Sequence, residues 1–501
     1  MMLLSLMAYA QTVHHMGCIR HAETTGHAHH HAMKRKLGTT SKNWDPAKTY
    51  RQLVVLVEFS DTKFKPAHNL EFYDNLFNHF TDDLHEGEER YGRGSVADYF
   101  RDQSHGKLNL HFDIVGPYQV SATAQSQFGY KETETEEATT MMVNDQAGRD
   151  FHQYDWDGDG SVDQILYIYA GPSSLLDEWG YLLPSTYTDI SVMTPDGLSI
   201  AQASTSAEYW STVRTFNSGI GTICHEFSHC LGLPDLYPTN GSTDYVVDDW
   251  ALMDGGNYIN YGWCPPNYGP LEQMQMGWIE PIELTSSTSV RNLKPIAEGG
   301  DAYLIRHTAY EYYLLENRQQ RGWDFGLPGK GLVVWHVCYD EDKWMRNSVN
   351  NSISQLGLQL VHADNLTYRQ WTHYLKANDL QAYDNDMFMN SRYLSTSPYP
   401  YITPFYTNEE LSATTSPKTE MYLANSKGQR MLDITISNIT MSADGLISFD
   451  FTNNDPSSGI VDAQADAPSS SVWYDLQGRR LSGRPTRKGT YIRQGRKYVV
   501  Q

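Results

Sequence analysis

Two histidines four residues apart give the sequence its clearest chemistry. They belong to the motif HEFSH at residues 225–229, within a stretch predicted to be helical over residues 216–231. Four residues advance a helix by about 400°, so His225 and His229 share one face and can bind one metal ion. Neutral imidazole nitrogens suit Zn²⁺. Glu226 lies about 100° farther round the helix, where it could reach a water on that ion without being a ligand.

The residues after the second histidine supply a candidate third ligand. Gly232 follows His229 by three residues, where a helix must end and a residue that tolerates positive φ is useful. Pro234 then prevents the helix from continuing. Asp235 can therefore turn back toward the histidines. We predict that His225, His229 and Asp235 hold Zn²⁺ together, the alternative being a helix with two core histidines.

A methionine farther along the chain could form the floor of this site. Residues 249–256 (DWALMDGG) place Met253 in a predicted tight turn, after an apolar pair and before two glycines. A polarisable thioether can support a metal site from below, although in isolation such a residue would be an ordinary core methionine. Because Met253 follows Asp235 by 18 residues, we interpret it as that floor.

An acidic loop forms a second candidate metal site. Residues 155–163 (DWDGDGSVD) match the first part of an EF-hand loop. The predicted calcium ligands are Asp155, Asp157, Asp159, Ser161 through its carbonyl, and Asp163. Leu166 stands where an EF-hand has its closing glutamate, so the missing ligand would have to come from elsewhere in the fold. We predict a structural Ca²⁺ here, and the alternative is a polar turn that leads into a strand.

Hydrophobic patterns predict the elements that must position these residues. Short apolar or alternating runs predict strands over residues 53–59, 108–114 and 165–170. Residues 68–84 are predicted to be helical. Ser95 and Asp98 form a capping-box pattern at the start of a second helix, with Asp in place of Glu.

The pattern changes at about residue 285. From there on, short apolar runs alternate with turn residues, a spacing typical of an all-β sandwich. Near the C-terminus, VWYDLQGRRL and TYIRQGRKYVV are two candidate strands. We therefore predict a metal-binding domain over 49–284, a β-rich accessory domain over 285–455, a linker over 456–471 and a C-terminal tail over 472–501.

The N-terminus is predicted to direct export. Residues 1–10 (MMLLSLMAYA) are apolar and end in a small-x-small pattern typical of a signal peptide, although no Lys or Arg precedes them. Residues 11–48 form a His-rich leader, which we interpret as a solvated tail and which could alternatively bind metal. Cys18 in this leader could carry a lipid or cap a metal as a thiolate. The chain has 5 cysteines, which do not form a disulfide framework, so we expect mostly buried free thiols.

The composition narrows the classes of function. Hydrophobic residues make up 40% of the 501 residues and charged residues 20%, so a sizeable core is feasible. Lys and Arg number 38 against 60 Asp and Glu, and the resulting net charge of -22 disfavours nucleic acid as a partner. No apolar run approaches the roughly 20 residues of a membrane-spanning helix, so we expect no transmembrane segment.

Taken together, these motifs resemble the M6 metallopeptidases, the immune inhibitor A-like secreted peptidases of metzincin type. HEFSHCLGLPDLY and WALMDGG carry the resemblance, with LVVLVEFSD, DWDGDGSVDQILYIYAG and LPGKGLVVWHVCYD, and it covers roughly residues 50–450. It implies an α/β (α+β) metzincin-like catalytic domain followed by an all-β sandwich-like domain and a short C-terminal β tail. It also implies that His225, His229 and Asp235 are zinc ligands, Glu226 is the general base and Met253 is the Met-turn residue.

The resemblance also raises two expectations about the cleft. Many metzincins place a tyrosine two residues after the Met-turn methionine, but here that position is Gly255. Tyr258 is the nearest substitute for a side chain that supports the transition state. In the metzincin architecture, residues 200–209 (IAQASTSAEY) would lie at the sheet edge beside the cleft, where an extended peptide could pair with them.

We therefore predict a zinc endopeptidase, secreted or at the surface of a bacterial cell, that acts as a monomer on protein or peptide substrates. Glu226 would take a proton from a metal-activated water and deliver it to the leaving amine. One alternative is a zinc-bearing host-surface adhesin with a vestigial peptidase domain, against which the intact Glu226 argues. Another is a zinc hydrolase that acts on a non-peptide ester or amide, against which the candidate edge strand argues.

Overall fold

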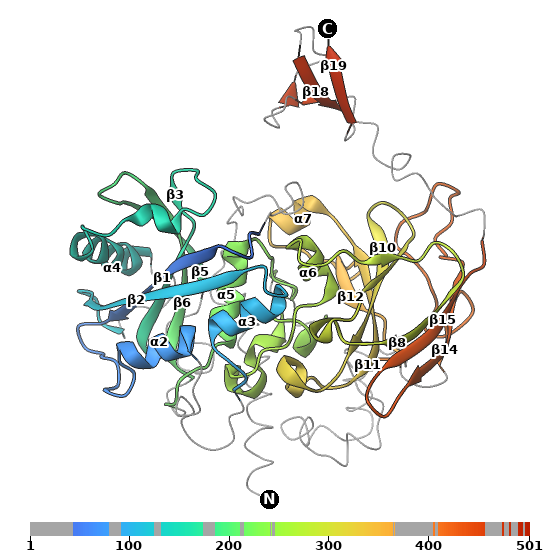
Figure 1. Cartoon of the computed structure of the whole chain (residues 1–501), viewed down its shortest axis with the longest axis horizontal. Coiled ribbons are helices and arrows are strands. Elements are labelled where there is room, and N and C mark those ends of the chain that lie inside the picture. Colours follow the sequence, from blue (N-terminus) through green and yellow to red (C-terminus); the bar gives the residue numbers. More distant parts are fainter. Residues whose placement is uncertain are drawn as a thin grey trace, which may run out of the picture.

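The structure is a computed structural model of the 501-residue chain (Figure 1). It describes residues 44–79, 92–124, 132–173, 186–210, 215–240, 246–363 and 409–455, a few isolated residues between them, and the strands of a C-terminal sheet. The predicted signal peptide (1–10), Cys18, nearly all of the leader and the predicted linker (456–471) lie outside the described residues. Within the described ranges, every helix is too short or too polar to cross a membrane.

A mixed sheet forms the centre of the histidine-bearing part (Figure 1). In spatial order its strands are β2 (Asn109–Gln119), β1 (Thr49–Glu58), β4 (Ile165–Pro172), β6 (Ser199–Tyr209) and β5 (Thr186–Met193), and the short β3 (Ser161–Val162) also pairs with β6. Neighbouring strands run parallel except β5, which runs antiparallel to β6. The strands predicted at residues 53–59, 108–114 and 165–170 are confirmed as β1, β2 and β4.

Helices cover both faces of this sheet. The helices α2 (Leu70–Asn78), α3 (Val96–Gln103) and α5 (Gly221–Leu231) pack on one face, and α4 (Glu132–Asp145) packs on the other. Successive strand residues point to opposite faces, so Val54 joins the first core cluster and Val55 the second. The apolar run of β1 is therefore buried on both sides.

Polar side chains cap the starts of two helices. The Ser95 hydroxyl accepts a hydrogen bond from the Asp98 N–H, and the Asp98 carboxylate accepts one from the Ser95 N–H, so the predicted capping box of α3 is confirmed. Asn69 caps α2 through its side chain. The helix α2 begins at Leu70, so the helix predicted over residues 68–84 started two residues too early. It ends at Asn78, and the last five residues of the predicted range lie outside the described part of the chain.

Two further sheets make up the β-rich region. The five-stranded sheet contains β12 (Leu358–Leu360), β11 (Gly331–Cys338), β10 (Glu311–Arg318), β9 (Tyr303–Arg306) and β7 (Ile282–Glu283). The four-stranded sheet contains β13 (Leu411–Ser412), β14 (Ile434–Met441), β15 (Ile447–Asn453) and β8 (Thr288–Leu293). The predicted mixed class of helices and several sheets is confirmed.

The five-stranded sheet has a buried face on each side. Tyr313 of β10 packs in a cluster shared with the four-stranded sheet. Its neighbour Tyr312, together with Trp335 of β11, belongs to the same cluster as Phe227 of α5. This largest cluster therefore crosses residue 284, so the β-rich region packs directly against the histidine-bearing region.

The C-terminal tail forms its own antiparallel sheet, which lies apart from the rest of the molecule in Figure 1. Its strands are β16 (Trp473–Tyr474), β17 (Arg480–Leu481), β18 (Gly489–Arg493) and β19 (Arg496–Val500). The prediction of two strands was wrong, because each predicted segment contains a pair of short strands. A Gln-Gly dipeptide interrupts each segment, and glycine weakens a strand at such a position.

The cysteines agree with the prediction of buried thiols. The four that lie in the described part of the chain are all free and buried: Cys224, Cys230, Cys264 and Cys338.

Candidate metal centre

The helix α5 carries both histidines of the centre. It begins at Gly221, later than the predicted start at residue 216, because Gly219 adopts a left-handed φ of 70° just before it. A Cβ on Gly221 would lie 1.9 Å from the carbonyl oxygen of Asn257, so glycine is needed for this close approach. The helix ends as predicted at Gly232, which has a φ of 100° and donates its N–H to the His229 carbonyl at 2.8 Å.

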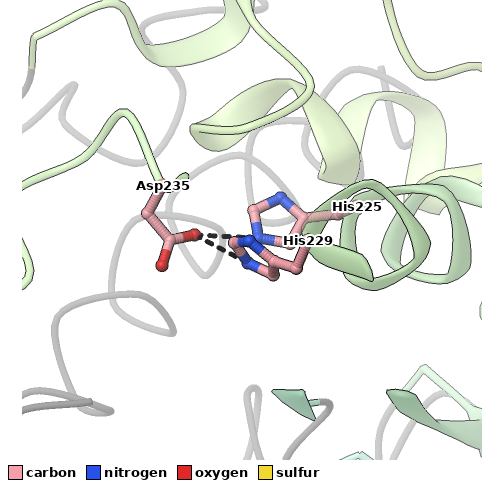
Figure 2. A group of neighbouring side chains, drawn as sticks. All are labelled: His225, His229 and Asp235. Atoms are coloured by element: carbon pink, nitrogen blue, oxygen red, sulfur yellow. Dashed lines mark hydrogen bonds and ion pairs between the residues drawn. The ribbon is translucent and has the colours of Figure 1, made fainter. Parts of the chain in front are cut away.

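Three predicted ligand atoms converge beside α5 (Figure 2). Asp235 Oδ1 lies 3.1 Å from Nε2 of His225 and 3.2 Å from Nε2 of His229. The two imidazole rings stand at 88° to each other. Asp235 is 3% exposed and His225 4% exposed, so the group lies almost entirely out of solvent.

Backbone carbonyls fix the orientation of both imidazoles. Nδ1 of His225 lies 2.8 Å from the Leu252 carbonyl oxygen, and Nδ1 of His229 lies 2.8 Å from the Leu233 carbonyl oxygen. A carbonyl only accepts, so each Nδ1 carries the proton, and a neutral ring directs its Nε2 lone pair toward Asp235. Ligand atoms about 2.0–2.1 Å from a tetrahedral Zn²⁺ are roughly 3.3 Å apart, close to the observed spacing. The donor set therefore fits zinc.

The charges in this group depend on one another. Burial opposes ionisation of Asp235, but the charge of His229 and hydrogen bonds from both imidazoles hold its pKa well below the usual range. Burial also acts to lower the pKa of His229, but the Asp235 carboxylate outweighs it and raises the pKa to about 9. Without a metal, the group is an ion pair that shares a proton. A divalent cation would take the place of that proton.

Glu226 lies beside the two histidines in the same helix. It is 7% exposed, and this burial raises the pKa of its carboxyl group, while the two imidazoles partly offset the effect. A carboxylate whose pKa is raised holds a proton more readily than an exposed one, which suits a group that must both accept and release a proton. Its place and its environment suit the predicted general base.

The turn around Met253 supports the centre through its backbone. The Met253 carbonyl accepts a hydrogen bond from the N–H of Leu236 at 2.7 Å, and Leu236 directly follows Asp235. The preceding carbonyl, of Leu252, is the one that orients His225. Met253 itself is fully buried. The turn thus holds the His225 ring and the segment that carries Asp235.

The region that contains this centre matches a known peptidase family. Residues 189–268 match the catalytic domain of the immune inhibitor A peptidases, family M6. All three predicted ligands, His225, His229 and Asp235, lie within the matched segment. Immune inhibitor A from Bacillus thuringiensis subsp. alesti is 22% identical to it over 267 residues, which are 44% of this chain. The match spans 38% of that relative, well under half of its length.

Two tyrosines of the matched segment make aromatic contacts. Tyr258, the predicted substitute for the missing tyrosine, is buried and packs edge-on against Trp210 with ring centroids 6.0 Å apart. Tyr237 instead lies nearly parallel to His225, with ring centroids 6.5 Å apart. Tyr237 was not among the predicted site residues, although its position two residues after Asp235 places it close to a predicted ligand in the sequence.

The predicted edge position of residues 200–209 is wrong. These residues form β6, which pairs with β4 on one side and with β5 on the other. Among the described strands, β5 therefore lies at one edge of this sheet. Its sequence, TYTDISVM, is rich in β-branched residues and was not recognised as a strand.

The acidic loop places its predicted ligands in two groups. Asp155, Asp157 and Asp159 each bring a carboxylate oxygen within 4.8 Å of the others. The Ser161 hydroxyl instead lies 2.8 Å from the Ser199 hydroxyl of β6. Asp163 is buried and accepts the backbone N–H of Trp156. The structure thus brings together three of the four predicted aspartate ligands, while the Ser161 carbonyl, the predicted ligand atom of that residue, stays a prediction.

Proposed function

We propose that this chain is a secreted zinc endopeptidase in which His225, His229 and Asp235 hold Zn²⁺ and Glu226 is the general base. The convergence of two Nε2 atoms and one Oδ1 atom, 3.1 and 3.2 Å apart, carries the proposal. The match of residues 189–268 to a peptidase catalytic domain supports peptide hydrolysis as the reaction. A binding protein with a vestigial peptidase domain is not favoured, because Glu226 is in place.

The division of labour follows from the chemistry of each group. Zinc, when bound, supplies the Lewis acidity that makes a water acidic near neutral pH and polarises the scissile carbonyl. The Glu226 carboxylate accepts the water's proton and delivers it to the leaving amine. The Leu252 and Leu233 carbonyls keep both imidazoles in the tautomer that presents Nε2. Tyr237 and Tyr258 are the two candidates for supporting the transition state.

The edge strand supports a protein or peptide substrate. β5 has β6 on one side, and no other strand in the described part of the chain pairs with its second side. An extended peptide could add to this free side by β-augmentation, which holds a substrate along its length and suits cleavage within a chain. We propose this arrangement for a monomeric enzyme.

Two further parts of the proposal concern location and calcium. The apolar residues 1–10 support export through a signal peptide to the outside of a bacterial cell. The cluster of Asp155, Asp157 and Asp159 supports a structural Ca²⁺ in the acidic loop, because hard cations prefer carboxylate oxygens.

Metal analysis combined with cleavage of a peptide library tests the central proposal. In Glu226→Gln, zinc should stay near one equivalent while kcat falls by about 10²–10⁴-fold, since only the proton acceptor is lost. Glu283→Gln, the same change on the exposed β7, serves as the control and should behave as wild type. Near-normal turnover in Glu226→Gln would overturn the general base. Failure of the wild type to bind zinc would overturn the centre.

A further inference from the structure

The two carboxylate oxygens of Asp235 have different partners. Oδ1 faces the imidazoles of His225 and His229. Oδ2 accepts a hydrogen bond from the Asn347 side-chain amide at 2.6 Å. The carbonyl oxygen of the same amide accepts the backbone N–H of Asp235, also at 2.6 Å. One asparagine thus binds the main chain and the side chain of a single predicted ligand.

Asn347 comes from the β-rich region, 112 residues farther along the chain. It follows the short helix α7 (Glu341–Met345), which lies between β11 and β12. Its φ of 52° is left-handed, and the Ser348 N–H bonds back to the Lys343 carbonyl at 2.9 Å, as at a helix C-terminus. Asparagine tolerates this backbone better than most residues and also supplies the amide.

Neighbouring asparagines fix the rest of the ligand segment. Asn350, which is fully buried, donates its amide to the Leu236 carbonyl at 2.7 Å. The Asn351 side-chain oxygen accepts the Thr239 N–H at 2.6 Å, and the Thr239 hydroxyl donates to the Asn347 carbonyl at 2.6 Å. The chain from Asp235 to Thr239 is therefore held against the loop that follows α7.

These contacts determine how Asp235 can meet a metal. A carboxylate with two free oxygens can bind a cation through both, or rotate away from it. Here the neutral amide occupies Oδ2 and leaves the negative charge in place, so only Oδ1 is directed at the imidazoles. We propose that Asn347 is a positioning residue that makes Asp235 a one-oxygen ligand and preserves an open coordination position. This inference rests on the zinc centre proposed above.

The zinc affinity of the full chain tests this role. Asn347→Gly removes the amide but retains a residue that suits a left-handed φ at a helix end. Zinc affinity, measured by competition with a chromophoric chelator, should fall about 10–100-fold, the range typical of lost partners of metal ligands. Asn292→Gly provides a matched control, because Asn292 also has a left-handed φ, of 56°, but is exposed on β8. This control should bind zinc as the wild type does.

A spectroscopic measurement separates positioning from a general loss of structure. The cobalt-substituted protein should show shifted d–d absorption bands in Asn347→Gly, since Asp235 could then bind through both oxygens. Asn347→Asp keeps the size of the side chain but offers Oδ2 no amide donor, so it should also shift the bands. Should the glycine variant not fold, the aspartate variant decides the question.

A double variant shows whether Asn347 acts through Asp235. On an Asp235→Ala background, Asn347→Gly should cause no further loss of zinc affinity, whereas independent effects would add. Wild-type zinc affinity together with an unchanged cobalt spectrum in folded Asn347 variants would overturn the inference and leave the proposed function intact. Unchanged zinc affinity in Asp235→Ala alone would instead overturn the proposed ligand set.

Discussion

The metal centre and the acidic loop both gather carboxylates, but they hold them in opposite ways. In the loop, Asp155, Asp157 and Asp159 lie within five residues of one another. Backbone N–H groups of the same loop hold them, as when Gly158 and Gly160 donate to Asp155 at 2.8 and 3.0 Å. The centre instead joins a helix, the segment after it and a loop 112 residues away.

Exposure separates the two sites as much as connectivity does. Solvent reaches Asp157 and Asp159, so water and salt can screen the repulsion between the loop carboxylates. Asp235 and His225 are almost fully buried, so any change in charge there acts in a poorly screened environment. Losing a group from the centre should therefore have larger effects than losing one from the loop.

The largest expected effect is the loss of a ligand from the centre. His229→Ala removes one of the three proposed ligands and its ion pair with Asp235, so zinc and peptide hydrolysis should disappear together. Metal analysis and a peptide assay measure both. Asp157→Ala, the matched change in the acidic loop, should retain about one equivalent of zinc. One equivalent of zinc in His229→Ala would show that the two sites do not differ in this way.

Asp235→Ala should produce the next largest effect. If Asp235 is the third ligand, zinc retention during dialysis should weaken clearly, and the catalytic rate should fall with it. If Asp235 only caps the segment after α5, stability should drop by about 1 kcal/mol while zinc stays bound. Full zinc occupancy with near-normal turnover would exclude the two-His-one-Asp centre.

The pH dependence of zinc binding should reveal the buried charge of the centre. In the metal-free protein His229 has a pKa raised to about 9, so the ring carries a proton at pH 7. Zinc must displace that proton, and affinity should therefore rise as pH increases toward about 9 and fall as pH decreases. Calorimetry in buffers of different ionisation enthalpy should count about one proton released per zinc at pH 7. Release of no proton would show that the ring is neutral in the metal-free state.

The smallest expected effect belongs to the acidic loop. At a calcium concentration of about 100 times Kd, removal of Ca²⁺ with a calcium-selective chelator should lower the thermal midpoint by roughly 5 °C. Zinc should stay bound. Asp157→Ala should melt at the same temperature with and without the chelator. A wild-type midpoint that does not respond to calcium removal would argue against a calcium site.

Local patterns predicted the elements whose signals lie within a few residues. The capping box of Ser95 and Asp98 depends on contacts three residues apart, and the end of α5 at Gly232 depends on one glycine and one proline. The apolar run of β1 is buried on both faces, as its composition indicated. Such features follow from backbone geometry and hydrophobicity, which a short window of sequence contains.

The missed features depend on partners that are distant in the sequence. Whether β6 lies at the edge is decided by β5, a separate strand that packs alongside it. The tail is an exception, because its signal is local: one glycine interrupts each of the two predicted segments. The largest core cluster crosses residue 284 because β10 and β11 are apolar on both faces, which indicates burial but not the partner.

The sequence by itself determined the chemistry of the centre: two histidines on one helical face, a glutamate beside them, and a glycine and a proline that turn Asp235 back. Helix periodicity and restricted φ angles make that outcome local. Only the tertiary structure decided which oxygen of Asp235 faces the imidazoles, because Asn347 holds the other one. That hydrogen bond has no signature in either segment, since it exists only after the β-rich region has packed against the histidine-bearing region.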